Sequence, residues 1–155
     1  AGGDKAVFAR DTRNMMMLAF LHDQDVGSWG HRDGDVVVRL RRARNLVKPW
    51  EKGVSFAGYW ENAGLVKTGG AGILTSVYAR PEGALFIVGN TGAADAAAVV
   101  EPAWRALKLD QRTARAVDAE TGEPIALSAG ASGTGFSVPV ARHDLRLVYV
   151  SRAAK

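Results

Sequence analysis

The segment from Gly72 to Arg80 has a period of two, which is the pattern of a β-strand with two faces. Residues 73, 75, 77 and 79 fall on one face, and residues 74, 76, 78 and 80 fall on the other. A second apolar run follows from Ala84 to Asn90. Between the two runs, Pro81 fixes its own φ angle and Gly83 accepts positive φ, which is turn chemistry. The pattern therefore predicts an antiparallel hairpin.

More segments with strand character surround this hairpin, separated by turn residues. They are Phe56–Trp60, Ala96–Glu101, Thr113–Asp118, Ile125–Ser128, Gly135–Val140 and Leu145–Ser151. Short strands at close spacing with turns between them are typical of a β-sandwich. We therefore predict a mainly β fold, an antiparallel β-sandwich of about seven or eight strands.

Upstream of the strands, apolar residues recur at the spacing of one helix face. The recurring positions are Val36, Leu40, Ala43 and Val47. A carboxylate at Asp33 or Asp35 suits the N-terminal end of a helix, and Pro49 would stop it. The segment from Val36 to Lys48 is therefore predicted to be a basic amphipathic helix.

The segment from Met15 to Leu21 is apolar throughout and shows no alternation. A short continuous run of this kind fits a strand that is buried on both faces, and it also fits a short core helix. Its length and abrupt polar ending favour the strand. We therefore expect a short buried strand followed by the one basic helix.

Composition narrows the class of protein. Hydrophobic residues make up 47% of the 155 residues, which is enough for a real core. The absence of cysteine excludes disulfides and thiolate metal sites. No apolar run approaches the roughly 20 residues that span a bilayer, so we expect no membrane partner. We also expect no cofactor and no bound metal.

Several motifs resemble, in order and spacing, the C-terminal end of bacterial glycoside-hydrolase-like proteins built from a (β/α)8 barrel followed by an antiparallel β-sandwich. These motifs are Gly58-Tyr59-Trp60-Glu61-Asn62 with Val66-Lys67-Thr68, Ser76-Val77-Tyr78, Ala84 to Thr91, Ala116 to Pro124 with its Asp-x-x-Thr-Gly-Glu turn, Val138-Pro139-Val140 and Arg142 to Val148.

The resemblance implies a division of the chain into residues 1–53, the end of a barrel, and residues 54–155, the C-terminal sandwich. It implies a carbohydrate partner, and it favours a secreted or periplasmic location. Nearly the whole barrel, where such enzymes keep their catalytic carboxylates, is absent from this sequence. The isolated chain is therefore not expected to be catalytic by itself, and its partner would be the rest of the barrel or another copy of the chain.

The densest group of polar residues follows the Met15–Leu21 run. It consists of His22, Asp23, Asp25, His31 and Asp33. At the C-terminal end of a barrel strand, His22 and Asp23 would lie at the rim of an active site, where they could orient a sugar hydroxyl, transfer a proton or ligate a metal. Asp25, His31 and Asp33 are interpreted as a solvated loop and a helix cap. The catalytic residues themselves remain unknown.

Aromatic residues are the second candidate, because sugar rings pack on aromatic faces. Trp29 and Trp60 are the predicted carbohydrate-binding residues. Tyr59 and Trp60 would point to opposite sides of a strand, and Trp104 would close the end of the sandwich. His143 with Asp144 is interpreted as a turn.

Net charge is +4, and cations concentrate between Arg39 and Lys52. Arg41, Arg44 and Lys48 would share a solvated helix stripe. Nucleic acid is not expected to bind there, since no base-reading motif accompanies the stripe. Two functions stay open. The first is the C-terminal portion of a carbohydrate-active enzyme with a non-catalytic stabilising sandwich, and the second is a free-standing carbohydrate-binding β-sandwich.

Overall fold

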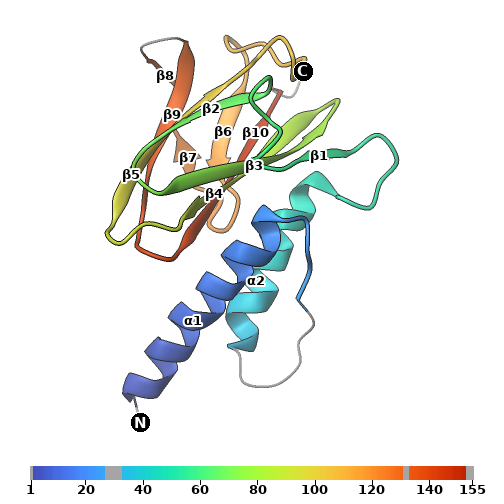
Figure 1. Cartoon of the computed structure of the whole chain (residues 1–155). Helices are drawn as coiled ribbons and strands as arrows, with labels where there is room; N and C mark the ends of the chain where they lie inside the picture. The colour runs from blue at the N-terminus through green and yellow to red at the C-terminus, as the bar shows by residue number, and fades with distance from the viewer. Residues whose placement is uncertain (1, 27–32, 131–132, 153–155) are drawn as a thin grey trace.

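A computed structural model describes residues 2–26, 33–130 and 133–152 of the chain. Two α-helices come first and are followed by strands (Figure 1). The helical elements are α1 (Gly2–Leu21), α2 (Gly34–Arg44) and the 3-10 helix η1 (Asn45–Val47). The strands are β1 (Ser55–Ala57), β2 (Val66–Gly69), β3 (Ile73–Arg80), β4 (Gly83–Asn90), β5 (Ala96–Pro102), β6 (Arg115–Asp118), β7 (Pro124–Ile125), β8 (Ser128–Ala129), β9 (Thr134–Val140) and β10 (Leu145–Ser151).

The strands form two antiparallel sheets that pack as a sandwich. The larger sheet has six strands in the order β1-β3-β4-β10-β6-β7, and the smaller has four in the order β2-β5-β9-β8. The predicted hairpin is present as β3 and β4, and in its register Val77 lies opposite Phe86. The predicted β-sandwich is therefore present as a sandwich-like region, with more strands than expected because β2, β7 and β8 are short separate strands. The chain as a whole is mixed α/β and not mainly β, because two helices precede the sheets.

Three layers result, because α1 and α2 cover the outer face of the six-stranded sheet (Figure 1). Phe86 and Val88 of β4 face the smaller sheet, while Leu85 and Ile87 face the helices. Every residue of β4 is consequently buried. The fold is thus a helix layer, a central sheet and an outer sheet, with one apolar core on each side of the central sheet.

The prediction of a short buried strand from Met15 to Leu21 is wrong, because these residues form the last turns of α1. Met16, Met17 and Phe20 are buried against the sheet while Leu18 is 46% exposed, which is helical rather than strand-like burial. The run contains no β-branched residue, and Met, Leu and Ala favour helices. The composition of the run therefore indicates a helix, whereas its short length favours a strand.

The predicted basic helix is confirmed. Asp33 caps α2, because its Oδ1 accepts hydrogen bonds from the backbone N–H groups of Asp35 and Val36 at 3.1 and 3.2 Å. All the residues of the predicted apolar face are buried. The helical segment ends before Pro49, where Lys48 adopts a left-handed conformation.

Candidate functional site

The end of α1 places the two candidate residues that the sequence singled out. The backbone N–H groups of Asp23 and Gln24 donate to the carbonyls of Phe20 and Ala19 at 3.2 and 2.9 Å. Asp23 has a φ angle of 58°. This is a helix C-terminus closed by a left-handed residue, a conformation that aspartate tolerates better than most residues. His22 and Asp23 therefore follow a helix and not a barrel strand, which removes the geometric reason for placing them at an active-site rim.

His22 lies among aromatic side chains contributed by the turn after β1. Its Nδ1 lies 2.7 Å from the carbonyl oxygen of Leu18, and its Nε2 lies 3.4 Å from the hydroxyl of Tyr59. Because a carbonyl can only accept, Nδ1 carries the proton in the neutral ring, and Nε2 is left as an acceptor. The imidazole also stacks on Trp60, with ring centroids 5.5 Å apart and an interplanar angle of 21°.

Trp60 is held by its neighbours and is still 55% exposed. A Cβ atom on Gly58 would lie only 2.3 Å from the indole, so the ring rests against the bare backbone of that glycine. The ring centroids of Tyr59 and Trp60 are 5.0 Å apart. The expectation that these two side chains point to opposite sides is wrong, because they occupy a turn in which Glu61 N donates to Gly58 O at 2.9 Å.

Ser76, in the middle of β3, joins this turn to α1. Its hydroxyl donates to the carbonyl of Leu21 at 2.8 Å and accepts from the backbone N–H of Tyr59 at 3.0 Å. The side chain is fully buried. Ser76 thus ties the backbone next to His22 to the backbone next to Trp60, a role that no sequence pattern indicated.

The carboxylate of Asp23 points toward Tyr78, whose hydroxyl donates a hydrogen bond to it. Burial of Tyr78 raises the pKa of its hydroxyl, and the hydrogen bond to Asp23 raises it further. Tyr78 therefore stays protonated and anchors Asp23. This geometry makes Asp23 a residue that closes the helix end onto the sheet.

Arg44 lies beside this cluster with its guanidinium 5.0 Å above the ring of Phe20. Its side chain is 13% exposed, and its ion pair with Asp25 is long, at 3.9 Å. Arg41 makes the closer contact with Asp25, at 2.9 Å. The expected solvated stripe is therefore wrong for Arg44, which packs as a cation on an aromatic face.

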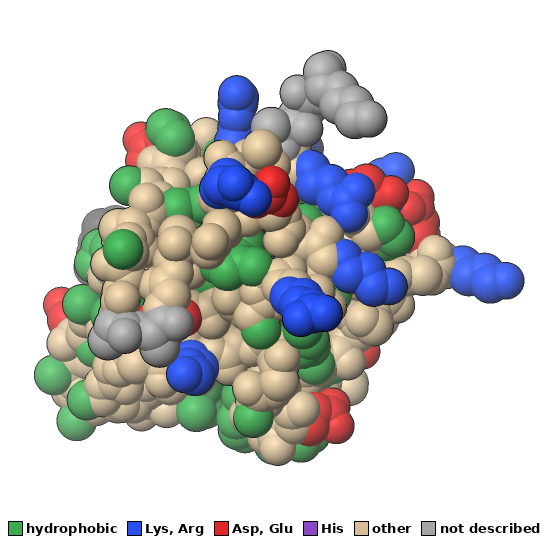
Figure 2. All heavy atoms as spheres, turned by 90° about the horizontal axis from the view of Figure 1, so that it is seen from above, with side chains coloured by type: hydrophobic (Ala, Val, Ile, Leu, Met, Phe, Trp, Pro, Cys, Tyr) green, Lys and Arg blue, Asp and Glu red, His purple; other side chains and the backbone are tan. Residues whose placement is uncertain are grey.

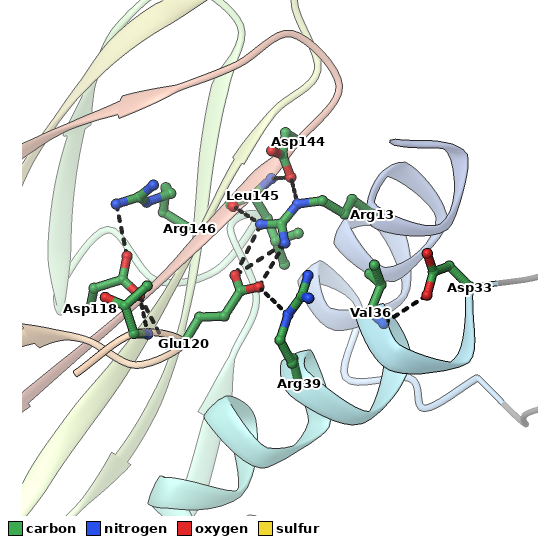
Figure 3. Close-up of polar contacts among 10 residues, drawn as sticks. Arg13, Asp33, Val36, Arg39, Asp118, Glu120, Asp144, Leu145 and Arg146 are labelled. Atoms are coloured by element: carbon green, nitrogen blue, oxygen red, sulfur yellow. Dashed lines mark hydrogen bonds and ion pairs between the residues drawn. The ribbon is translucent and has the colours of Figure 1, made fainter. Parts of the chain in front are cut away.

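A second polar cluster ties α1 and α2 to the far end of the central sheet (Figure 3). Arg13 of α1 donates to both carboxylate oxygens of Glu120, to Asp144 Oδ1 at 2.6 Å and to the carbonyl of Leu145. Arg39 of α2 reaches the same Glu120 at 3.2 Å. Hydrogen bonds and ion pairs connect Arg13, Arg39, Glu120 and Asp144 into one network. We call this network the clasp, because it links the helix layer to the central sheet.

The Asp-x-x-Thr-Gly-Glu turn positions Glu120 for this clasp. Asp118 is buried, and its Oδ1 accepts hydrogen bonds from the backbone N–H groups of Glu120 and Thr121 at 2.9 and 3.0 Å. Arg146 pairs with the other oxygen of Asp118 at 2.8 Å. His143 and Asp144 form the predicted turn, in which His143 has a φ angle of 57°.

Other candidates from the sequence fall outside these clusters. Trp29 and His31 lie outside the described residues. Within residues 2–26, 33–130 and 133–152, no three His, Asp or Glu side chains gather into a group that could hold a metal ion. None of the described helices is both long and apolar enough to cross a bilayer.

The cluster of Trp60, His22 and Tyr59 presents an exposed indole, an imidazole and a phenol at one edge of the molecule. These groups can stack on an apolar ring face and exchange hydrogen bonds with hydroxyl groups.

No family model matches the sequence, and no curated protein matches it significantly. Two solved structures show partial similarity, one of Gan42B, described as a GH42 β-galactosidase, and one of a catalytic mutant of Gan42B from G. stearothermophilus. Each is 20% identical in sequence over 56% of this chain, with TM-scores of 0.37 and 0.36. The chain covers 10% of the length of those proteins.

Proposed function

We propose that this chain is the C-terminal portion of a carbohydrate-active enzyme of the glycoside-hydrolase type, in which the β-sandwich is a non-catalytic module that stabilises the catalytic part. The order and spacing of the motifs from Gly58 onward support this role. The β-sandwich of the structure supports the proposal. The Asp118–Glu123 turn and the closing strand β10 support it as well, because both bind Arg13 of the helix layer.

The observation that carries the proposal is the outer surface of the helix layer. Five of the eight exposed large apolar side chains of the described residues belong to the helical segment: Val7, Phe8, Leu18, Val38 and Leu46. Val7 and Leu18 lie about three turns apart on the side of α1 that faces away from the sheet. Figure 1 also shows the N-terminal half of α1 extending past the sandwich. Exposed apolar surface of this kind indicates contact with another protein surface.

The test measures whether this exposed apolar surface makes the chain self-associate. Size-exclusion chromatography with light scattering, over a range of concentrations, should show self-association of the purified 155-residue chain. The double variant V7S/L18S should shift it to monomer, whereas V99S, which removes a 44% exposed valine from the smaller sheet, should not. A chain that is monomeric at every concentration and binds no apolar dye would contradict the proposal.

The non-catalytic part of the proposal has its own test. The isolated chain should release no product from a panel of chromogenic glycosides. Hydrolysis that disappears in H22A would show that the chain holds a working catalytic site, and the proposal would then be wrong.

A free-standing carbohydrate-binding module is the second candidate, favoured by the exposure of Trp60 beside His22 and Tyr59. Affinity electrophoresis through gels that contain soluble polysaccharides would detect it as retardation of the chain. W60A should lose the retardation. W50A is the matched control, since Trp50 is 67% exposed and makes none of the ring contacts of Trp60.

A further inference from the structure

The end of the sandwich where β5 and β10 finish carries a hollow that is separate from both clusters described above. Its volume is about 780 Å³, and β2, the end of β5, and the turn that follows β5 line it. The lining residues that matter below are Val66, Lys67, Glu101, Trp104, Arg105 and Gln111. Such a hollow is large enough for one or two sugar rings.

Trp104 forms a fixed apolar wall of this hollow. Its indole Nε1 donates to the carbonyl of Thr134 at 2.8 Å, which sets the orientation of the ring. The inner side of the ring packs against the core between the sheets, and part of it stays exposed. A ring held in this way can receive the C–H face of a pyranose with little loss of side-chain freedom.

Two cations stand beside that wall without an ion pair among the described residues, Lys67 and Arg105. Glu101 lies opposite Lys67 in the register of β2 and β5, but its carboxylate is directed toward Gly130, where an added Cβ would lie 2.7 Å from Glu101 Oε1. Gln111 adds an amide that can both donate and accept hydrogen bonds.

The surrounding surface is also positive. Figure 2 looks onto this end of the molecule and shows several Lys and Arg side chains gathered around it. The segments that meet here contribute Lys67, Arg105, Lys108, Arg112, Arg115 and Arg152, against Glu82, Glu101 and Asp110. An excess of cations around a concave surface attracts anions.

We infer that this hollow binds an acidic saccharide, a pyranoside that carries a carboxylate or a sulfate group. The sugar ring packs on Trp104, the anionic group lies between Lys67 and Arg105, and Gln111 contacts hydroxyl groups. Single-stranded nucleic acid fits less well, because it stacks successive bases on several aromatic residues, and among the described residues of this lining Trp104 is the only aromatic one. The inference goes beyond the proposed function, because it concerns a different surface from the helix layer.

Calorimetric titration of the whole chain at about 0.15 M salt tests the inference, because that concentration screens loose surface attraction. The probes are oligogalacturonate for the carboxylate, a chondroitin sulfate oligosaccharide for the sulfate, a neutral galacto-oligosaccharide, and single-stranded oligothymidylate. We expect at least one acidic saccharide to bind tenfold or more tightly than the neutral one and the oligonucleotide.

The variants locate the site. K67Q/R105Q should weaken acidic-saccharide binding at least tenfold, whereas R112Q/R115Q, which removes the same charge from the same end outside the hollow, should weaken it less than twofold. W104F keeps an aromatic wall without the indole N–H and is used in place of W104A, which would open the core. Thermal melting confirms that each variant is folded.

Equal losses in the two double variants, equal binding of the oligonucleotide, or no binding of either acidic saccharide would each overturn the inference. Any of these results would leave the self-association of the helix layer, and with it the proposed function, untouched.

Discussion

Trp60 keeps its position because residue 58 has no side chain. G58A would place a methyl group within 2.3 Å of the indole, which must then leave its contact with His22. Since Trp60 is on the surface and can turn outward, we expect a change of less than about 1 kcal/mol in the free energy of unfolding. Near-ultraviolet circular dichroism should show loss of the aromatic signal that W60F also removes.

G64A is the matched control for this change, because a Cβ atom on Gly64 meets nothing within 4 Å. If G58A and G64A gave the same aromatic spectrum as the unmodified chain, the description of Trp60 as resting on Gly58 would be wrong.

Asp23 combines a left-handed backbone with a hydrogen bond from Tyr78. D23A and D23G both remove the bond, but only glycine accepts a φ angle of 58° without strain. D23A should therefore be less stable than D23G by about 1 kcal/mol in urea unfolding. Equal stabilities would show that the helix end relaxes to another conformation.

At the scale of elements, Gly89 of β4 lets α1 approach the central sheet. A Cβ atom at this position would lie 2.8 Å from both Leu21 Cδ1 and Met17 Cγ. G89A should destabilise the protein by about 1–3 kcal/mol, because the helix has to shift away from the sheet. Chemical unfolding measures the loss, and G64A again serves as the control.

The clasp between α1, α2 and the central sheet should give stability a specific pH dependence. Burial of Glu120 acts to raise the pKa of its carboxyl, but the hydrogen bonds and charges of Arg13 and Arg39 outweigh burial, and the pKa falls below its usual 4.5. A lowered folded-state pKa stabilises the fold above the usual value, and that contribution is lost as pH falls from about 4.5 through the folded-state pKa.

E120Q is the variant that reports this contribution. It should cost about 1–3 kcal/mol at pH 7, because Arg13 loses one of its two carboxylate partners. The difference in melting temperature from the unmodified chain should shrink as pH falls below about 4.5. E123Q, in the same turn but outside the clasp, should show no such narrowing, and a constant difference for E120Q would contradict the assignment.

The sequence predicted most strands and the face of the second helix, because period-two and helical spacings report burial directly. It misassigned α1, because an unbroken apolar run looks alike in a two-sided strand and in a helix that packs on a sheet. It named His22, Asp23 and Trp60, and the structure brings His22 and Trp60 into contact. It could not find Ser76, Gly58 or Arg13, because their partners are distant in sequence and each residue type is ordinary where it stands.

For the molecule as a whole, the three layers predict a gradient of local stability. β4 is buried on both faces and paired on both sides, by β3 and β10, whereas Val7 and Phe8 near the start of α1 are nearly half exposed. Amide hydrogen exchange should therefore be slowest in β4 and fastest in the first turns of α1 among the helices and long strands. Uniform protection of α1 and β4 would indicate that the surface of α1 is covered in solution, for instance by a second copy.

The clasp also has a consequence for biosynthesis. Arg13 leaves the ribosome long before its partners, since Glu120 and Asp144 follow 107 and 131 residues later. Until β10 has emerged, the sheet that covers the Met-rich side of α1 lacks the strand between β4 and β6, and exposed apolar surface of this kind promotes aggregation and chaperone binding. Premature termination before residue 144 should therefore give a nascent chain that aggregates instead of a smaller folded protein.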